Sequence, residues 1–127
     1  MGPLNFNDGG ELMKIKIEEK EGVTIVFIDG NVLQENVPIF RVKLLELIEA
    51  NKMRIVLDMI SCNYISSMCL AAIVDVKKKV SEKGGAIKMA RVNKLVLNLL
   101  ETTNLIKQIE VYDDVSGAVK SFKPKKD

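Results

Sequence analysis

The chain opens with a regular alternation of apolar and polar residues. Between Met13 and Glu18, methionine and isoleucine residues alternate with charged ones, which predicts a strand with one face in water. The apolar run from Val23 to Ile28 predicts a second strand. Only the short turn Lys20-Glu21-Gly22 separates the two, and so short a connection allows only antiparallel pairing.

Helical spacing and short apolar runs then alternate. A first helix is expected to begin at 36–38 and end at 51–52, and a second to begin at 66–67 and end near 84. Strands are expected at 53–57, 86–90 and 109–112. The apolar positions of the second helix are Leu70, Ile73, Val74 and Val80.

Two further helices follow. The third is capped by Asn93 and its apolar face comprises Leu95, Val96, Leu99 and Leu100; the fourth is capped by Asp113 or Asp114 and runs to Phe122. Helices that alternate with strands after an opening hairpin predict an α/β domain with a mixed β-sheet and about four helices.

The chain is expected to form one domain. Residues 1–12 are rich in Gly, Asn, Asp and Pro and are interpreted as a flexible leader, residues 13–122 as the domain, and residues 123–127 as a polar tail. A length of 127 residues is sufficient for a single core.

Composition narrows the classes of function. The chain is 47% hydrophobic and 28% charged, which is ordinary for a globular protein, and its net charge of +2 is too small to favour nucleic acid as a direct partner. No apolar run is long enough to span a membrane, and no secretory signal is evident, so we expect a cytoplasmic protein without a membrane partner.

Few residues suit catalysis. The chain has no histidine, the commonest general base and metal ligand, and no glycine-rich phosphate loop, so we expect no enzyme, metal or cofactor. Cys62 and Cys69 lack Cys-x-x-Cys spacing and are interpreted as small core residues. Asp58 is the candidate buried carboxylate, and its simplest interpretation is a side chain that caps the turn at 61–64.

The segment from Leu57 to Leu70 carries the most specific motif. It contains Leu-Asp-Met, then Tyr-Ile, then two serines at a helix start, and it resembles the signature of STAS domains, in particular the bacterial anti-sigma factor antagonists. Gly30 and Val32, and the Glu-x-Thr element at Glu101, extend the resemblance over roughly 13–122. It implies the STAS fold.

The resemblance also implies a function. Ser67 falls on the serine that a partner kinase phosphorylates in that family, and the partner is an anti-sigma factor with serine kinase activity. The expected partner-binding residues are Gly30, Asn31, Leu33, Ser66, Ser67, Met68 and Cys69.

Several of these residues depart from the family pattern, and alternatives stay open. Ser66 replaces an acidic residue, Met68 a small one and Cys69 a glycine, while Asn31 and Leu33 depart from the pattern of the first loop. By position alone, a serine at a helix start is a cap. The alternative function is a STAS module that is not phosphorylated and acts as a scaffold, an oligomer component or a small-ligand sensor.

Overall fold

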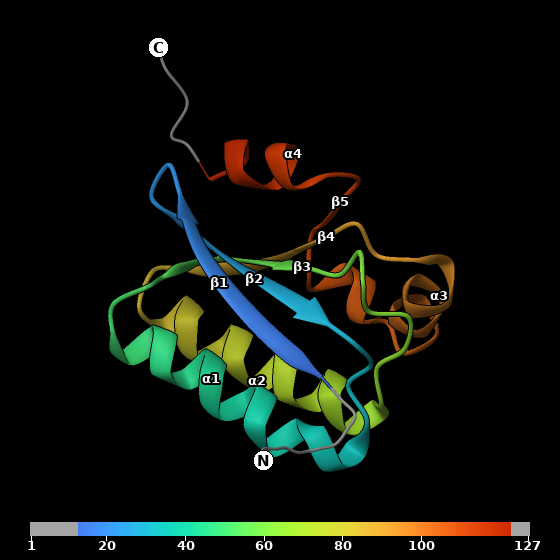
Figure 1. The fold of residues 1–127 in the computed structure, drawn as a ribbon. Helices are drawn as coiled ribbons and strands as arrows, with labels where there is room; N and C mark the ends of the chain where they lie inside the picture. Colours follow the sequence, from blue (N-terminus) through green and yellow to red (C-terminus); the bar gives the residue numbers. More distant parts are fainter. Residues whose placement is uncertain (1–12, 123–127) are drawn as a thin grey trace.

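A five-stranded mixed sheet forms the centre of the protein in the computed structural model, which describes residues 13–122 (Figure 1). The strand order follows the sequence from one edge to the other. The strands are β1 (Lys14–Lys20), β2 (Val23–Asp29), β3 (Arg54–Asp58), β4 (Ala86–Ala90) and β5 (Val111–Tyr112).

The sheet changes direction once. β1 and β2 pair antiparallel, with Lys14 opposite Asp29 and Lys20 opposite Val23, which confirms the predicted hairpin. All later neighbours pair parallel. Parallel pairing requires crossover connections, and helices supply them, so the carboxyl ends of β2, β3 and β4 meet at one edge.

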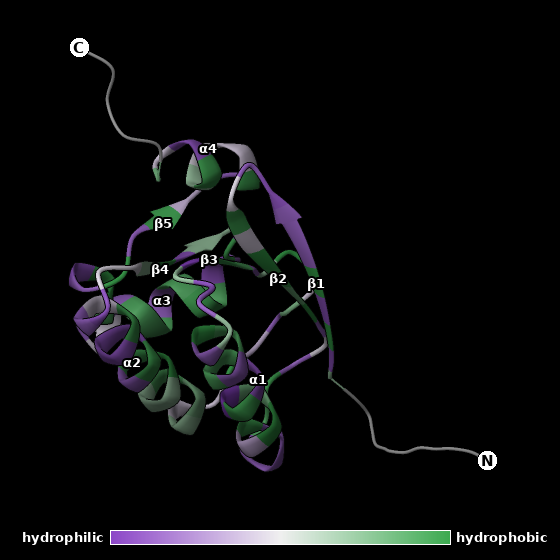
Figure 2. Ribbon diagram, turned by 90° about the vertical axis from the view of Figure 1, so that its left-hand side faces the viewer, coloured by the Kyte–Doolittle hydropathy of each residue, from purple (hydrophilic) through white to green (hydrophobic). Residues whose placement is uncertain are grey.

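Helices cover the two faces of the sheet unequally. The first three helices lie on one side of the sheet and the short last helix lies on the other (Figure 2). The three are α1 (Val37–Glu49), α2 (Ser67–Glu82) and α3 (Lys94–Thr102), and the last is α4 (Val115–Lys120). One face is therefore buried under a full layer, and the other is covered only in part.

The main core lies between the sheet and the three-helix layer. In α1 the apolar residues recur at helical spacing, and five of them are buried: Val37, Phe40, Leu44, Leu47 and Ile48. A smaller cluster under α4 joins Val23, Ile25, Val56, Ala90, Ala118 and Val119. Each large aliphatic side chain buried in this way contributes about 1.5–3 kcal/mol of transfer free energy.

Some local predictions were wrong. Leu95 is 51% exposed and does not belong to the buried face of α3, and Val74 is only partly buried. β5 is two residues long rather than four, and α4 ends at Lys120 rather than Phe122. The 3-10 turns at Gln34–Asn36 and Leu105–Lys107 were not predicted.

The proposed leader at 1–12 and tail at 123–127 lie outside the described residues. Within 13–122, no helix is both long and apolar enough to cross a membrane.

Candidate functional site

The candidate site forms where β3 passes through a turn into α2. β3 is buried over Ile55–Asp58, and the chain then leaves the sheet edge through residues 59–66. Ser66 is the N-cap of α2: its backbone is extended and its side-chain oxygen accepts a hydrogen bond from the Cys69 amide at 3.2 Å. The sequence-based prediction of a serine cap is confirmed.

The two serines occupy different environments. Ser66 is buried, at 9% exposure, and its oxygen is engaged by the cap, whereas Ser67 is exposed at the first position of the helix. A phosphate could be added to Ser67 without breaking the cap. Ser67 is therefore the serine of the pair that a modifying enzyme can reach.

The loop after β2 is joined to this turn by backbone pairing. Val32 and Ile65 form a parallel bridge, in which the Val32 amide donates to Tyr64 O at 3.0 Å and the Ser66 amide donates to Val32 O at 2.9 Å. The Gly30 amide also donates to Ser61 O at 3.0 Å. The two segments that the sequence placed in one surface, 30–33 and 66–69, are thus adjacent.

Three asparagines hold the same region from the side. Asn31 Oδ1 accepts from the Asn63 amide at 3.1 Å, and Asn93 Nδ2 donates to Asn63 O at 3.2 Å. Asn93 also caps α3 by accepting from Val96 N at 2.8 Å. Asn31 therefore stabilises the turn at Asn63 through this hydrogen bond, which the sequence did not predict.

The surface around Ser67 is partly apolar. The side chains of Leu33 and Met68 are 40% and 52% exposed. Ser67 directly follows Ser66, whose amide pairs with Val32 O of the 30–33 loop. Of the seven residues expected to bind the partner, Ser66 and Cys69 are buried, and we call the other five the docking surface: Gly30, Asn31, Leu33, Ser67 and Met68. Tyr64 and Ile60 are also exposed on the adjoining turn, and the sequence did not single out either as a candidate contact, since Tyr64 was read only as a motif position.

Cys69 does not belong to the docking surface, contrary to the sequence-based expectation. The side chains of Cys69 and Cys62 are both fully buried in the main core, so Cys69 packs under the first turn of α2. Burial raises the pKa of both thiols, and the neighbouring Cys62 raises that of Cys69 further. The sequence-based interpretation of Cys62 and Cys69 as small core residues agrees with this placement.

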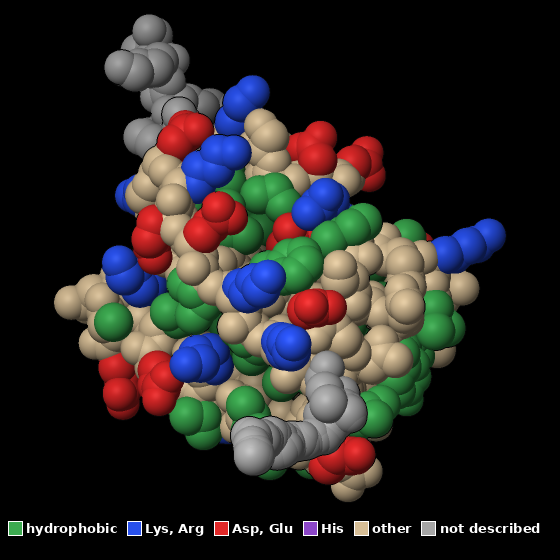
Figure 3. Space-filling model, in the orientation of Figure 1, with side chains coloured by type: hydrophobic (Ala, Val, Ile, Leu, Met, Phe, Trp, Pro, Cys, Tyr) green, Lys and Arg blue, Asp and Glu red, His purple; other side chains and the backbone are tan. Residues whose placement is uncertain are grey.

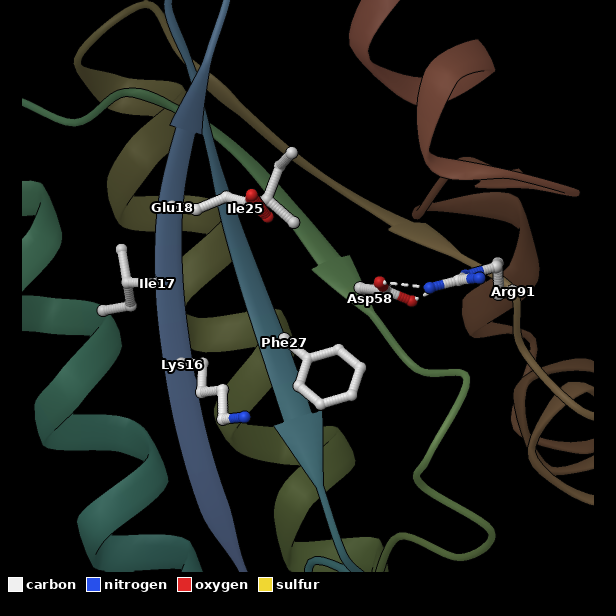
Figure 4. Close-up of a pocket in the computed structure, with 7 residues that line it drawn as sticks. All are labelled: Lys16, Ile17, Glu18, Ile25, Phe27, Asp58 and Arg91. Carbon is white, nitrogen blue, oxygen red and sulfur yellow. Dashed lines mark hydrogen bonds and ion pairs between the residues drawn. The ribbon is translucent and has the colours of Figure 1, made fainter.

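Asp58 is held mainly by a residue that the sequence did not single out. Arg91, which directly follows β4, donates from Nε and Nη2 to the two carboxylate oxygens at 3.0 and 2.8 Å (Figure 4). Asp58 also accepts from the Ile60 amide at 3.3 Å, so it caps the turn earlier than predicted. The hydrogen bonds from Arg91 to Asp58 raise the pKa of the guanidinium.

Within 13–122, no group of three or more Cys, Asp or Glu residues is placed to hold a metal ion. Ser67 is exposed, and its hydroxyl takes part in none of the side-chain hydrogen bonds among residues 13–122.

The sequence from 14 to 118 matches the STAS domain family. The chain belongs to the STAS domain family. It is 28% identical over 108 residues to an anti-sigma F factor antagonist of Paenibacillus polymyxa, covering 84% of this chain and 92% of the relative.

Solved STAS structures confirm the fold. A candidate anti-sigma factor antagonist of Thermotoga maritima superposes with a TM-score of 0.81 at 24% identity, covering 84% of this chain and 92% of that one. The Bacillus cell fate determinant SpoIIAA in its phosphorylated form superposes with a TM-score of 0.69 at 10% identity, over 87% of this chain and all (100%) of that one. The predicted α/β STAS architecture is confirmed.

Proposed function

We propose that this STAS domain is an anti-sigma factor antagonist. Its docking surface binds an anti-sigma factor with serine kinase activity, and phosphorylation of Ser67 by that partner ends the binding. The observation that carries the proposal is the exposure of Ser67 beside Leu33 and Met68, on a surface held together by the Val32–Ile65 bridge. The similarity to the Paenibacillus polymyxa antagonist supports the same function.

The physical effect of the phosphate is local. Phosphorylation adds about −1.5 to −2 charges, and the first turn of a helix favours negative charge, so α2 has no reason to unfold. The change occurs on the exposed side. A partner that places an apolar or acidic group against Leu33 and Met68 meets a desolvation cost and a repulsion that the unmodified hydroxyl does not impose.

The energy required is modest. A coupling free energy of about 1–3 kcal/mol changes an affinity by one to two decades, which is within the range of a single dianion in an interface. Since Ser66 keeps the cap in both states, binding can change while the fold stays the same.

The test combines phosphorylation with binding. The full chain is incubated with ATP and an anti-sigma factor kinase from the same genome, and intact-mass analysis follows the gain of one phosphate. We expect the gain in the native protein and in Ser66→Ala, and none in Ser67→Ala. Absence of both phosphate and binding in the native protein would overturn the proposal.

A control variant tests whether the negative charge must stand at position 67 to weaken binding. Ser116 is exposed on α4, on the opposite side of the sheet. Ser67→Glu is expected to weaken binding by tenfold or more, about 1.4 kcal/mol, with an unchanged circular dichroism spectrum. Ser116→Glu is expected to bind as the native protein does.

In a second candidate function, the docking surface binds a partner but Ser67 is not phosphorylated. Met68 is bulky and exposed next to the acceptor, and Ser66 supplies a neutral cap rather than a carboxylate at the position before it. These two features favour a STAS module that binds a partner constitutively, as a scaffold or oligomer component. Recovery of phosphate on Ser67 from cells would exclude it.

A further inference from the structure

The sheet face that α4 leaves uncovered contains a pocket away from the docking surface. It has a volume of about 470 Å³ and is lined by Lys16, Ile17, Glu18, Ile25, Phe27, Asp58 and Arg91. This volume lies within the range of small-molecule sites. Figure 3, which views this side of the molecule, shows hydrophobic side chains exposed among charged ones.

The strand register explains how the pocket is built. Lys16 lies opposite Phe27 across the β1–β2 pair, and Phe27 lies opposite Asp58 across the β2–β3 pair. Because directly opposed residues share a face, these side chains form one row across the sheet. Arg91 closes the row through its two hydrogen bonds to Asp58, as Figure 4 shows.

Phe27 is the apolar centre of this row. It is partly exposed and belongs to neither core cluster, whereas its strand neighbour Ile25 is buried under α4. An aromatic ring left open in the floor of a pocket offers a flat surface for stacking. The floor thus favours a planar apolar group.

Cations stand on both sides of that ring. The Arg91 side chain is 39% exposed, and its Nη1 group makes no hydrogen bond to any residue of 13–122. Lys16 likewise has no hydrogen bond or ion pair with the described part of the chain. The charges of Asp58 and Arg91 offset each other, so Lys16 supplies the positive charge for the negative group of a ligand, and the exposed Nη1 group of Arg91 supplies a further hydrogen-bond donor.

The backbone conformation of Arg91 supports a role for its side chain in this pocket. Its φ of 59° is in the left-handed region, which a residue with a Cβ adopts at a cost. The conformation is fixed by the hydrogen bond from the Arg91 amide to Tyr112 O at 3.0 Å. It places the guanidinium against Asp58 at the pocket, where a glycine would have met the backbone requirement without strain.

We propose that this pocket binds a small organic anion with a planar aromatic body. The ring stacks on Phe27, and the carboxylate is held between Lys16 and the free edge of the Arg91 guanidinium. Glu18 lies two residues from Lys16 on β1, opposite Ile25, and borders the pocket one row away from Phe27. The lining of this pocket includes neither Ser67 nor any other residue of the docking surface.

The test uses indole-3-acetate as the probe. Amide chemical shifts of the ¹⁵N-labelled full chain are followed during titration, and we expect saturable shifts at Phe27, Asp58 and Arg91. Indole-3-acetamide has the same ring without the charge, and acetate has the charge without the ring. Each is expected to bind about tenfold more weakly.

Variants assign the contacts. Lys16→Gln is expected to weaken indole-3-acetate binding roughly threefold or more. Phe27→Leu is expected to weaken it by removing the aromatic ring while keeping an apolar side chain. Lys20→Gln changes the same charge on the same strand face outside the pocket and is expected to have no effect. Absence of saturable shifts, equal binding of the amide, or equal effects of the two lysine variants would overturn the proposal.

Discussion

Asp58 and Arg91 join the carboxyl ends of two neighbouring parallel strands. The pair is bidentate, at 3.0 and 2.8 Å, and links residues that lie 33 positions apart in the sequence. Asp58 is the buried member, with 6% of its side chain exposed against 39% for Arg91. The pair therefore fixes the point at which the chain leaves β3 for the turn that carries Ser67.

Removal of one partner is expected to cost more than removal of both. Arg91→Ala leaves a buried carboxylate without its cation, and we expect it to lower the free energy of unfolding by about 1–3 kcal/mol. Asp58→Asn should lower it by a smaller amount, since the amide can still accept from Ile60 N. Urea denaturation of both single variants and the double variant measures the coupling.

The outcome distinguishes a structural from a functional role for Asp58. If Asp58→Asn lowers stability but leaves anti-sigma factor binding unchanged, the carboxylate acts through the fold. Additive effects of the two substitutions would contradict the pairing, because residues in direct contact do not behave independently.

The serines at the start of α2 are expected to respond differently to substitution. Ser66→Ala removes the cap that holds Cys69 N and should cost about 1 kcal/mol of stability. Ser67→Ala removes an exposed hydroxyl and should change stability by less than about 0.5 kcal/mol. Thermal or urea unfolding of the two variants provides the comparison, and equal losses would contradict the assignment of Ser66 as the cap.

Local signals predicted most of the fold. Asn93 and Ser66 were found as caps because a short polar side chain directly before an apolar helical pattern satisfies an unpaired amide of the helix's own first turn. Asn104 directly follows the Glu-x-Thr element, and its φ of 66° lies in the left-handed region that asparagine tolerates better than most residues. Each of these depends on residues close in sequence.

Features that depend on distant neighbours were missed. Leu95 lies within the apolar pattern of α3, but no other element of residues 13–122 buries it, and the pattern shows only which residues are suited to burial. Arg91 was missed because nothing around it in the sequence indicates a partner 33 residues away. Cys69 was placed on the surface by its motif position, while helix geometry turns its side chain into the core.

Asn31 is expected to affect binding through the shape of the loop. Asn31→Ala removes the acceptor for the Asn63 amide, so the 30–33 loop is held by one contact fewer. We expect a loss of about 1 kcal/mol in anti-sigma factor binding, measured by calorimetry, with a small change in melting temperature. Faster hydrogen exchange at the Asn63 amide should accompany it.

The matched control for that variant is Asn98→Ala, which changes an exposed asparagine on α3. It should alter neither binding nor exchange at Asn63. Unchanged exchange in Asn31→Ala would show that the side chain does not hold the turn, whatever happens to binding.

The two cysteines are expected to be unreactive in the folded protein. The thiolate is the reactive form, and burial raises the pKa of both Cys62 and Cys69 and also blocks access to them. Their reaction with a disulfide reagent at pH 8 should be at least about a hundredfold slower than in guanidinium chloride, because modification requires opening of the structure. Ser116→Cys introduces an exposed thiol on α4 and should react at the rate of an unfolded one. Rapid modification of Cys69 in the native chain would contradict its burial and would place its side chain on the docking surface.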